Sequence, residues 1–210
     1  MKILQINELN INSVDSIISD KNIEIFNKKE LLANDDADIV LIGIGDNGYE
    51  FDIDKLIELR NNGKTIIFTH SNPISFLDKM EDEKEIEFEK RNNIYLAKLK
   101  DNFGINGFAD SYDYEFYDTI TVKDNTIIST GEYSIQPTHT TGIVLSDKYK
   151  IIADSNQCKP GMTNYYLAIL SEANKGDVVM WNVGHCAYGK NDIKEFSKIE
   201  KNILDNLLQK

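Results

Sequence analysis

The chain has 210 residues, of which 41% are hydrophobic and 28% are charged, as in globular proteins long enough to bury a substantial core. Its formal net charge of −12 argues against binding to nucleic acid or to an anionic membrane surface, because nothing offsets the like-charge repulsion. No apolar run reaches the length of a membrane-spanning helix, so no membrane insertion is expected.

The first half of the sequence alternates between short β-rich runs and amphipathic segments. It predicts strands at 2–7, 22–27, 37–45 and 64–70, and helices at 12–19, 28–35 and 52–63. The runs 37–45 and 64–70 are almost wholly apolar, which is typical of parallel strands buried on both faces. Asp52 is a predicted N-cap, and Gly63 is placed to end that helix. This alternation predicts an α/β sheet with right-handed crossovers.

The second half is less regular and favours antiparallel strands. It begins with a charged helix over 81–104 that ends at Gly104, followed by a hairpin over 117–130 that turns at 123–125. A strand pair is predicted within 142–155, and two further strands within 165–184 are joined by a turn at 174–176. The last predicted element is a helix over 192–208 capped by Asp192 and Glu195. The whole chain, 1–210, is therefore predicted to form a single flavodoxin-like three-layer α/β domain. Its central sheet would be mostly parallel, with antiparallel strands added in the second half.

The sequence contains three histidines, His70, His139 and His185. His70 directly follows a predicted buried strand, and His185 follows another. Binding sites in open α/β sheets form in the crevice beyond the carboxyl ends of the strands, so we expect these two imidazoles to share one crevice. The alternative is that each histidine only caps a loop or hydrogen-bonds to the backbone.

Several short motifs resemble the class I glutamine amidotransferase-like superfamily, and within it the ThuA-like (trehalose-utilisation type) branch. The similarity spans 37–208 and includes "GKTIIFTH" with His70, "HTTG" from His139, and "NKGDVVMWNVGH" ending at His185. Two features depart from the branch pattern. The turn before the strand that ends at His70 has one glycine, Gly63, and Thr140 stands where the branch has a proline.

The resemblance implies that glutaminase chemistry is lost. Glutamine hydrolysis in this superfamily needs a cysteine on the turn after the central strand, but 68–72 reads Phe-Thr-His-Ser-Asn. His185 occupies the place of the triad histidine, while Ala187 replaces its orienting glutamate. Cys186, although next to His185 in the sequence, is then not expected to act as its catalytic partner. The chain is therefore not expected to be a functional glutamine amidotransferase.

Other polar residues near the predicted strand ends are candidates for ligand binding. Asp46, Ser71, Asn72 and His139 form this set, with His70 and His185 as the candidate catalytic residues. Each has a simpler explanation: Asp46 begins an Asp-Asn-Gly turn, and Ser71 lacks the Gly-x-Ser-x-Gly elbow of a nucleophile. The acidic and aromatic run 110–118 is able to stack on a sugar, or to pack as an edge strand or loop.

No cofactor is predicted. Gly43, Gly45 and Gly48 match the dinucleotide fingerprint formally, but no helix starts at the third glycine, and the loop after the first strand lacks the glycines of a flavin site. No local His-x-His or His-x₃-His spacing supports a metal site, although three converging imidazoles would suit zinc.

Three functional hypotheses follow. The first is a domain that binds or transforms a small polar or carbohydrate-derived ligand near His70 and His185, with one imidazole as general acid or base. The second is a non-catalytic interaction or scaffold module of a larger assembly, and the third is a histidine-ligated metal-dependent hydrolase. Two cysteines and an N-terminus without a signal-peptide pattern predict a cytoplasmic protein, and a homo-oligomer is compatible with the sequence.

Overall fold

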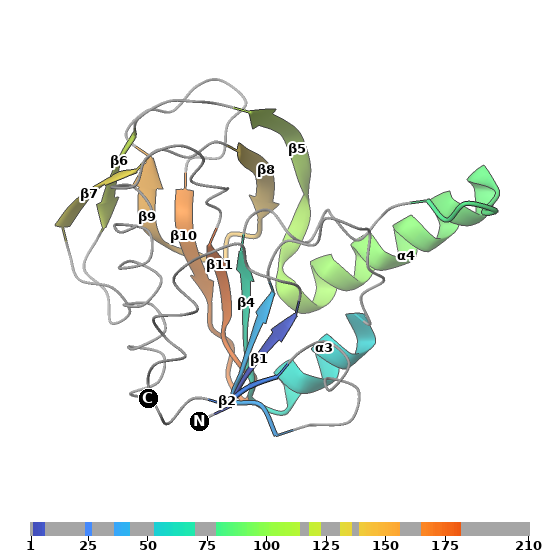
Figure 1. The fold of residues 1–210 in the computed structure, drawn as a ribbon, viewed down its shortest axis with the longest axis horizontal. Helices are drawn as coiled ribbons and strands as arrows, with labels where there is room; N and C mark the ends of the chain where they lie inside the picture. Colours follow the sequence, from blue (N-terminus) through green and yellow to red (C-terminus); the bar gives the residue numbers. More distant parts are fainter. Residues whose placement is uncertain are drawn as a thin grey trace.

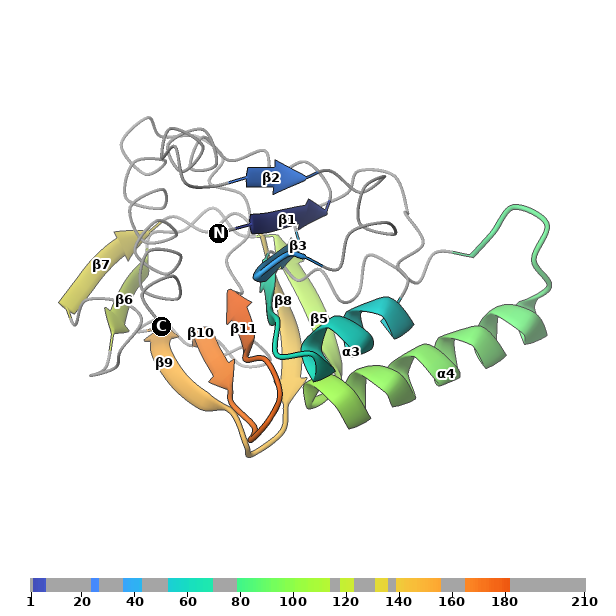
Figure 2. The same cartoon turned by 90° about the horizontal axis from the view of Figure 1, so that it is seen from below.

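The computed structural model describes residues 2–6, 24–26, 36–42, 53–69, 79–113, 118–122, 131–135, 139–155 and 165–181. Its elements, drawn in Figures 1 and 2, are β1 (Lys2–Ile6), β2 (Glu24–Phe26), β3 (Ile39–Ile42), α3 (Ile53–Asn61), β4 (Thr65–Thr69), α4 (Glu85–Phe103), β5 (Ile105–Asp113), β6 (Asp118–Val122), β7 (Gly131–Ile135), β8 (His139–Leu145), β9 (Lys150–Ser155), β10 (Tyr165–Leu170) and β11 (Val178–Trp181).

A nine-stranded sheet forms the centre of the molecule, in the order β2-β1-β3-β4-β11-β10-β9-β6-β7. The first five strands of that order pair in parallel. Counted along the chain, their order matches the 2-1-3-4-5 sheet of flavodoxin-like folds. The predicted fold class is therefore confirmed, and the predicted strands at 2–7, 22–27, 37–45 and 64–70 coincide with β1, β2, β3 and β4.

The antiparallel half of the sheet begins at β11. Strand β10 runs antiparallel to β11, and the two are joined across the predicted turn, where Asn174 has φ 64°. Strands β9, β6 and β7 continue the sheet in antiparallel order. The predicted antiparallel strands of the second half are thus confirmed.

Two pairings differ from the sequence prediction. The partner of β6 is β7, with Val122 opposite Gly131, so the tight hairpin turn predicted at 123–125 is wrong and residues 123–130 connect the two strands. Strands β8 and β9 do not pair with each other: β8 pairs with β5, whereas β9 pairs with β10 and β6. Alternating hydrophobicity identifies a strand but not its partner, which depends on residues far along the chain.

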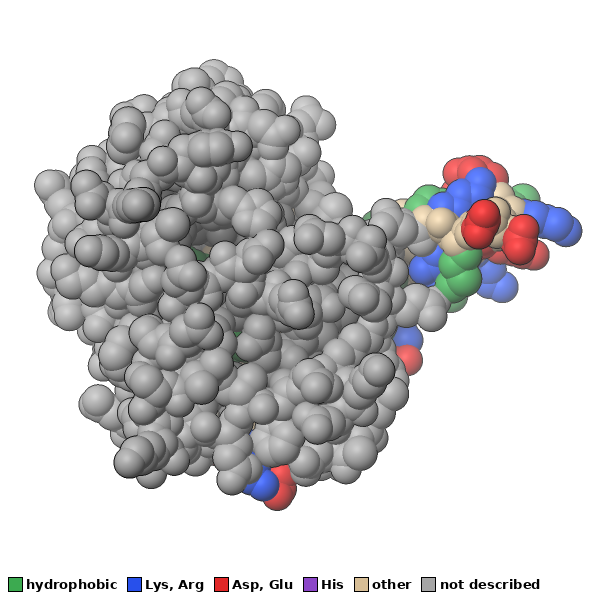
Figure 3. All heavy atoms as spheres, in the orientation of Figure 1, with side chains coloured by type: hydrophobic (Ala, Val, Ile, Leu, Met, Phe, Trp, Pro, Cys, Tyr) green, Lys and Arg blue, Asp and Glu red, His purple; other side chains and the backbone are tan. Residues whose placement is uncertain are grey.

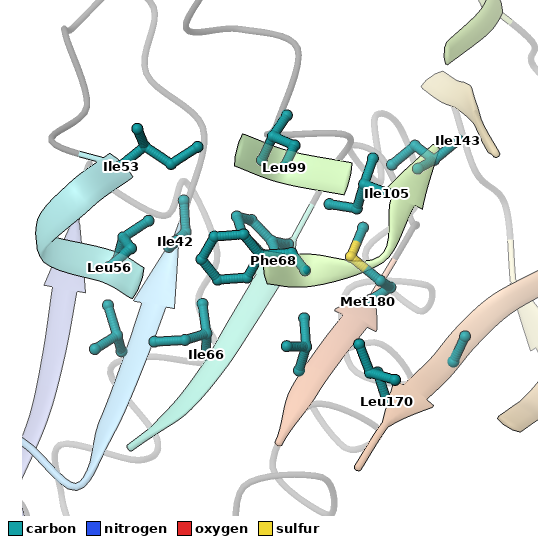
Figure 4. Close-up of a cluster of buried hydrophobic side chains, with 14 of the residues drawn as sticks. Ile42, Ile53, Leu56, Ile66, Phe68, Leu99, Ile105, Ile143, Leu170 and Met180 are labelled. Carbon is teal, nitrogen blue, oxygen red and sulfur yellow. The ribbon is translucent and has the colours of Figure 1, made fainter. Parts of the chain in front are cut away.

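Both faces of the central strands are buried. Every residue of β3 and of β11 is buried, as expected for short Val- and Ile-rich parallel strands. On one face, Ile42, Phe68 and Met180 point towards α3 and α4 (Figure 4). On the opposite face, Ile67 and Val179 are buried as well, which is the burial expected of the middle layer of a three-layer fold.

The helices α3 and α4 lie side by side on one face of the sheet (Figure 2). Helix α3 ends before Gly63, which has φ 83°, and α4 ends at Gly104, which has φ 65°. Both positions need the left-handed conformation that glycine adopts without strain, so the predicted helix ends are confirmed. The hydroxyl group of Tyr149 donates a hydrogen bond of 2.6 Å to the carbonyl oxygen of Phe103, the last residue of α4.

A second sheet, made of β5 and β8, follows α4 directly and is antiparallel. Ile105 and Ile143 join Leu99 of α4 in the buried cluster between the two sheets (Figure 4). The predicted helices at 12–19, 28–35 and 192–208, and the predicted cap Asp52, lie outside the described residues. Neither described helix combines the length and the apolar character needed to cross a membrane.

Candidate functional site

The carboxyl ends of β3, β4 and β11 lie side by side in the sheet (Figure 1). Ile42, the last residue of β3, pairs with Phe68 of β4, and Thr69, the last residue of β4, pairs with Trp181, the last residue of β11. All three strands are parallel, so the segments that follow them start from one edge of the sheet. In a flavodoxin-like fold this edge is where ligands bind.

Most of the predicted site residues belong to the segments that leave this edge. Asp46 comes four residues after β3, His70 directly follows β4, and His185 comes four residues after β11. Asp46, His70, Ser71, Asn72 and His185 all lie outside the described residues, so their convergence stays a prediction. The structure does place the last residues of the three strands, Ile42, Thr69 and Trp181, next to one another at this edge of the sheet.

His139 has a different origin from the other two histidines. It is the first residue of β8, opposite Asp113 of β5, and therefore belongs to the two-stranded sheet. Figure 1 shows the end of β5 and the beginning of β8 on the same side of the molecule as the carboxyl ends of β1, β3 and β4. The backbone register thus places His139 opposite a carboxylate-bearing residue rather than after a parallel strand.

The end of β11 beneath the candidate site is apolar. Trp181 is 2% exposed, and Phe68 on the neighbouring strand is also 2% exposed. Phe68 and Phe103 of α4 form a T-shaped ring pair, with ring centroids 5.6 Å apart. These contacts give the three strand ends a packed hydrophobic support.

The amino end of the same strands carries a buried polar network centred on Arg60, which is 1% exposed. Its Nε donates to the carbonyl oxygen of Gly176 (3.1 Å), its Nη1 to the carbonyl oxygen of Asn102, and its Nη2 to Glu172 (2.9 Å). The guanidinium also lies 5.9 Å from the ring centroid of Phe103. Arg60 therefore ties the end of α3 to the end of α4 and to the β10–β11 turn.

Glu172 completes the network with two further cations. Its carboxylate accepts a hydrogen bond from Lys148 (3.1 Å), and Lys175 lies 3.5 Å away. The hydrogen bond from Lys148, and then that from Arg60, hold the pKa of Glu172 below its usual value. A carboxylate already satisfies this guanidinium, so the network is structural and is not an open site for an anionic ligand.

Sequence reasoning did not identify Arg60, although a signal was present. Position 60 follows Ile53 and Leu56 on the buried face of α3, at spacings of i+7 and i+4, where an apolar residue is the usual occupant. A charged residue on such a face requires buried partners. Among the described residues, no group of three or more His, Cys, Asp and Glu side chains has the arrangement of a metal site.

The sequence matches no protein-family model and no curated protein. Comparison with solved structures shows the fold alone. The cytoplasmic protein STM1381 of Salmonella typhimurium LT2 superposes with a TM-score of 0.67 at 12% identity, over 99% of both chains. A ThuA-like protein from Bacteroides uniformis superposes with a TM-score of 0.61 at 8% identity, over 100% of this chain and 92% of the other.

The same fold also occurs inside a longer protein. The β-galactosidase of Bacillus circulans sp. alkalophilus superposes with a TM-score of 0.61 at 10% identity, and the match covers 99% of this chain. It covers only 30% of the enzyme, so this chain is similar to one part of that protein.

Proposed function

We propose that the chain is a glutamine amidotransferase-like domain of the ThuA-like type, without glutaminase activity, that binds or transforms a small polar or carbohydrate-derived ligand. The ligand would bind at the carboxyl edge of β3, β4 and β11. The ThuA-like structural neighbour supports the fold assignment, and the sequence "FTHSN" after β4, which lacks a cysteine, supports the loss of glutaminase chemistry.

The pairing of Thr69 with Trp181 carries the proposal for the site. Because these residues end adjacent parallel strands, the segments leading to His70 and His185 start from neighbouring points of one edge. Ordinary imidazoles titrate near neutral pH, which suits either histidine to act as a general acid or base. Asp46, Ser71, Asn72 and His139 would supply hydrogen bonds to the polar groups of the ligand.

The experiment is a saturation-transfer NMR screen with monosaccharides, disaccharides and their keto derivatives, carried out with the wild-type chain and with His70→Gln and His185→Gln. We expect at least one sugar to bind the wild-type protein and to bind each variant about tenfold more weakly, because each variant loses a hydrogen bond to the ligand. The thermal unfolding midpoint should stay unchanged. The control is Asn62→Ala, an exposed position at the other end of the strands, which should bind as the wild type does.

Two results would contradict the proposal. If no sugar of the panel binds the wild-type chain, the ligand class is wrong. If a sugar binds and both histidine variants retain full affinity, the carboxyl edge is not the site.

The alternative is a non-catalytic interaction module. The similarity to 30% of a β-galactosidase chain favours it, because there the fold is one part of a larger protein. In that case no sugar would bind, and the histidine variants would change neither stability nor any ligand signal.

A further inference from the structure

Helix α4 extends well beyond the body of the molecule. Its buried residues are Leu99 and Phe103, near its C-terminal end, whereas its N-terminal half projects into solvent (Figures 1 and 3). With 19 residues the helix is about 28 Å long, so its N-terminal turns extend beyond the two residues that are buried. A projecting helix of this kind offers an interaction surface, and this one is separate from the proposed ligand site.

The outward side of α4 carries exposed apolar residues. Ile86 is 75% exposed and Ile94 is 50% exposed, with Lys90 midway between them at intervals of four residues. Helical periodicity places these three residues in one stripe, roughly opposite Leu99 and Phe103. Of the exposed large hydrophobic side chains among the described residues, Met80, just before α4, and these two isoleucines cluster here, and Val144 lies elsewhere. We call Ile86, Lys90, Ile94 and the exposed Ala97 the outer stripe.

Local contacts stabilise the projecting half of the helix. Arg91 donates to both carboxylate oxygens of Glu83, at 2.9 and 2.8 Å, and its guanidinium lies 5.6 Å from the centroid of the Phe88 ring. These hydrogen bonds from Arg91 lower the pKa of Glu83 to about 2. The outer stripe is therefore presented on an ordered helix rather than on a frayed end.

The charges of this region divide into two blocks. Segment 81–89 contains six acidic residues and one lysine, whereas segment 90–100 contains four basic residues and no acidic residue. An antiparallel copy of the same helix would place each block against its opposite. A parallel copy would place like charges together, so the charge pattern is self-complementary in the antiparallel orientation and favours a second copy of this helix in that orientation.

We infer that the outer stripe of α4 pairs with that of a second copy of this chain in an antiparallel, two-fold symmetric helix contact centred on Lys90. In this register Ile86 of each copy lies against Ile94 of the other, and the acidic segment of each copy lies along the basic segment of the other. The same patch serves both copies, as a closed two-fold interface requires. The aliphatic stem of Lys90 covers the isoleucines while its ammonium group reaches solvent.

Sedimentation velocity at physiological ionic strength tests the oligomeric state, since salt then screens the long-range repulsion between two chains of charge −12. We expect the wild-type chain to sediment at twice its 24.0 kDa mass at micromolar concentrations, and Ile86→Glu/Ile94→Glu to sediment as a single chain. The matched control is Val144→Glu, which changes an exposed apolar residue outside α4 and should remain dimeric. A wild-type monomer, or a dimer unaffected by the double substitution, would overturn the inference.

Cysteine cross-linking tests the orientation. In a background with Cys158 and Cys186 replaced by serine, Lys90→Cys should form a covalent dimer on mild oxidation, because the two copies of position 90 meet at the symmetry axis. Lys100→Cys should not, because its two copies lie at opposite ends of the contact. Equal cross-linking at both positions would indicate a parallel pairing and contradict the proposed register.

Discussion

The two ends of the β4–β11 strand pair differ in how they hold polar groups. At the amino end, Arg60, Glu172 and the backbone of Gly176 satisfy one another in a buried network. Near the carboxyl end, Phe68 of β4 and Trp181 of β11 are buried and apolar, and the polar candidate residues come after these two strands in the sequence. A buried charge with satisfied partners contributes to stability, whereas under the proposed function the polar residues after the carboxyl ends would bind the ligand. Substitutions at the amino end should therefore lower the free energy of unfolding, whereas substitutions of the polar residues after the carboxyl end should lower ligand affinity and leave stability unchanged.

The largest effect on stability is expected for Gly176→Ala. A Cβ atom at this position would overlap the carbonyl group of Lys64, which belongs to the rigid entry into β4. We expect a loss of at least about 4 kcal/mol in the free energy of unfolding, or failure to fold, because neither backbone is free to move away. Urea unfolding followed by the fluorescence of Trp181, the one tryptophan of the sequence, measures the loss.

Gly107→Ala is the matched control for that substitution. An added Cβ meets no atom within 4 Å at Gly107, which lies in β5. Its free energy of unfolding should change by less than about 1 kcal/mol. Similar losses for the two glycine variants would contradict the close approach of the β10–β11 turn to β4.

The next largest effect is expected for Arg60→Met. The substitution keeps much of the volume but removes three hydrogen bonds, two of them to backbone carbonyl groups that stay inside the protein. We expect a loss of about 3 kcal/mol in the free energy of unfolding. Arg91→Met is a matched control, since Arg91 also pairs with a glutamate and stacks on a phenylalanine, but its side chain is 30% exposed. It should lose about 1 kcal/mol or less.

A smaller effect is expected from Glu172, and it depends on pH. Its pKa is lowered in the folded protein by Lys148 and Arg60, so its contribution is present above the unfolded pKa and is lost as pH falls through the folded value. Glu172→Gln should therefore be less stable than the wild type by about 1 kcal/mol at neutral pH. The difference should shrink as the solution is acidified below about pH 4.

Denaturant titrations at several pH values check this behaviour. Glu58→Gln provides the comparison, because Glu58 pairs with Lys55 on the surface of α3 and its side chain is 53% exposed. Its effect should be only a few tenths of a kcal/mol. A Glu172→Gln deficit that stays constant into acid would show that the carboxylate charge is not what stabilises the network.

The sequence predicted the parallel half of the fold well because its signals are local. The continuous apolar runs of β3, β4 and β11 identify buried strands, and Gly63 and Gly104 mark helix ends through the conformation that each position requires. Pairing in the second half was predicted less well. Both β8 and β9 read as strands, yet β5, the partner of β8, and β6, one of the two partners of β9, lie far from them in sequence, and no local pattern encodes such distances.

The candidate site was predictable only as far as the strand order. That His70 and His185 follow buried strands is visible in the sequence, and the adjacency of those strands follows from the sheet. The position of His139 opposite Asp113 could not be predicted from the sequence. It depends on the pairing of β5 with β8, and these two residues are 26 positions apart in the chain. Arg60 was missed because a charged residue near a helix end is usually solvated.

Gly104 links the direction of α4 to that of the second sheet. It is the single residue between Phe103 and Ile105, and a Cβ there would lie 2.8 Å from Ser146 and 3.2 Å from Tyr149, so the linker has no room to swing. We therefore expect the angle between α4 and β5 to be fixed by the packing around Gly104. A tilt of the projecting end of α4 would then move Ile105 at the start of β5, so a partner bound to the outer stripe would act on the buried cluster that contains Ile105.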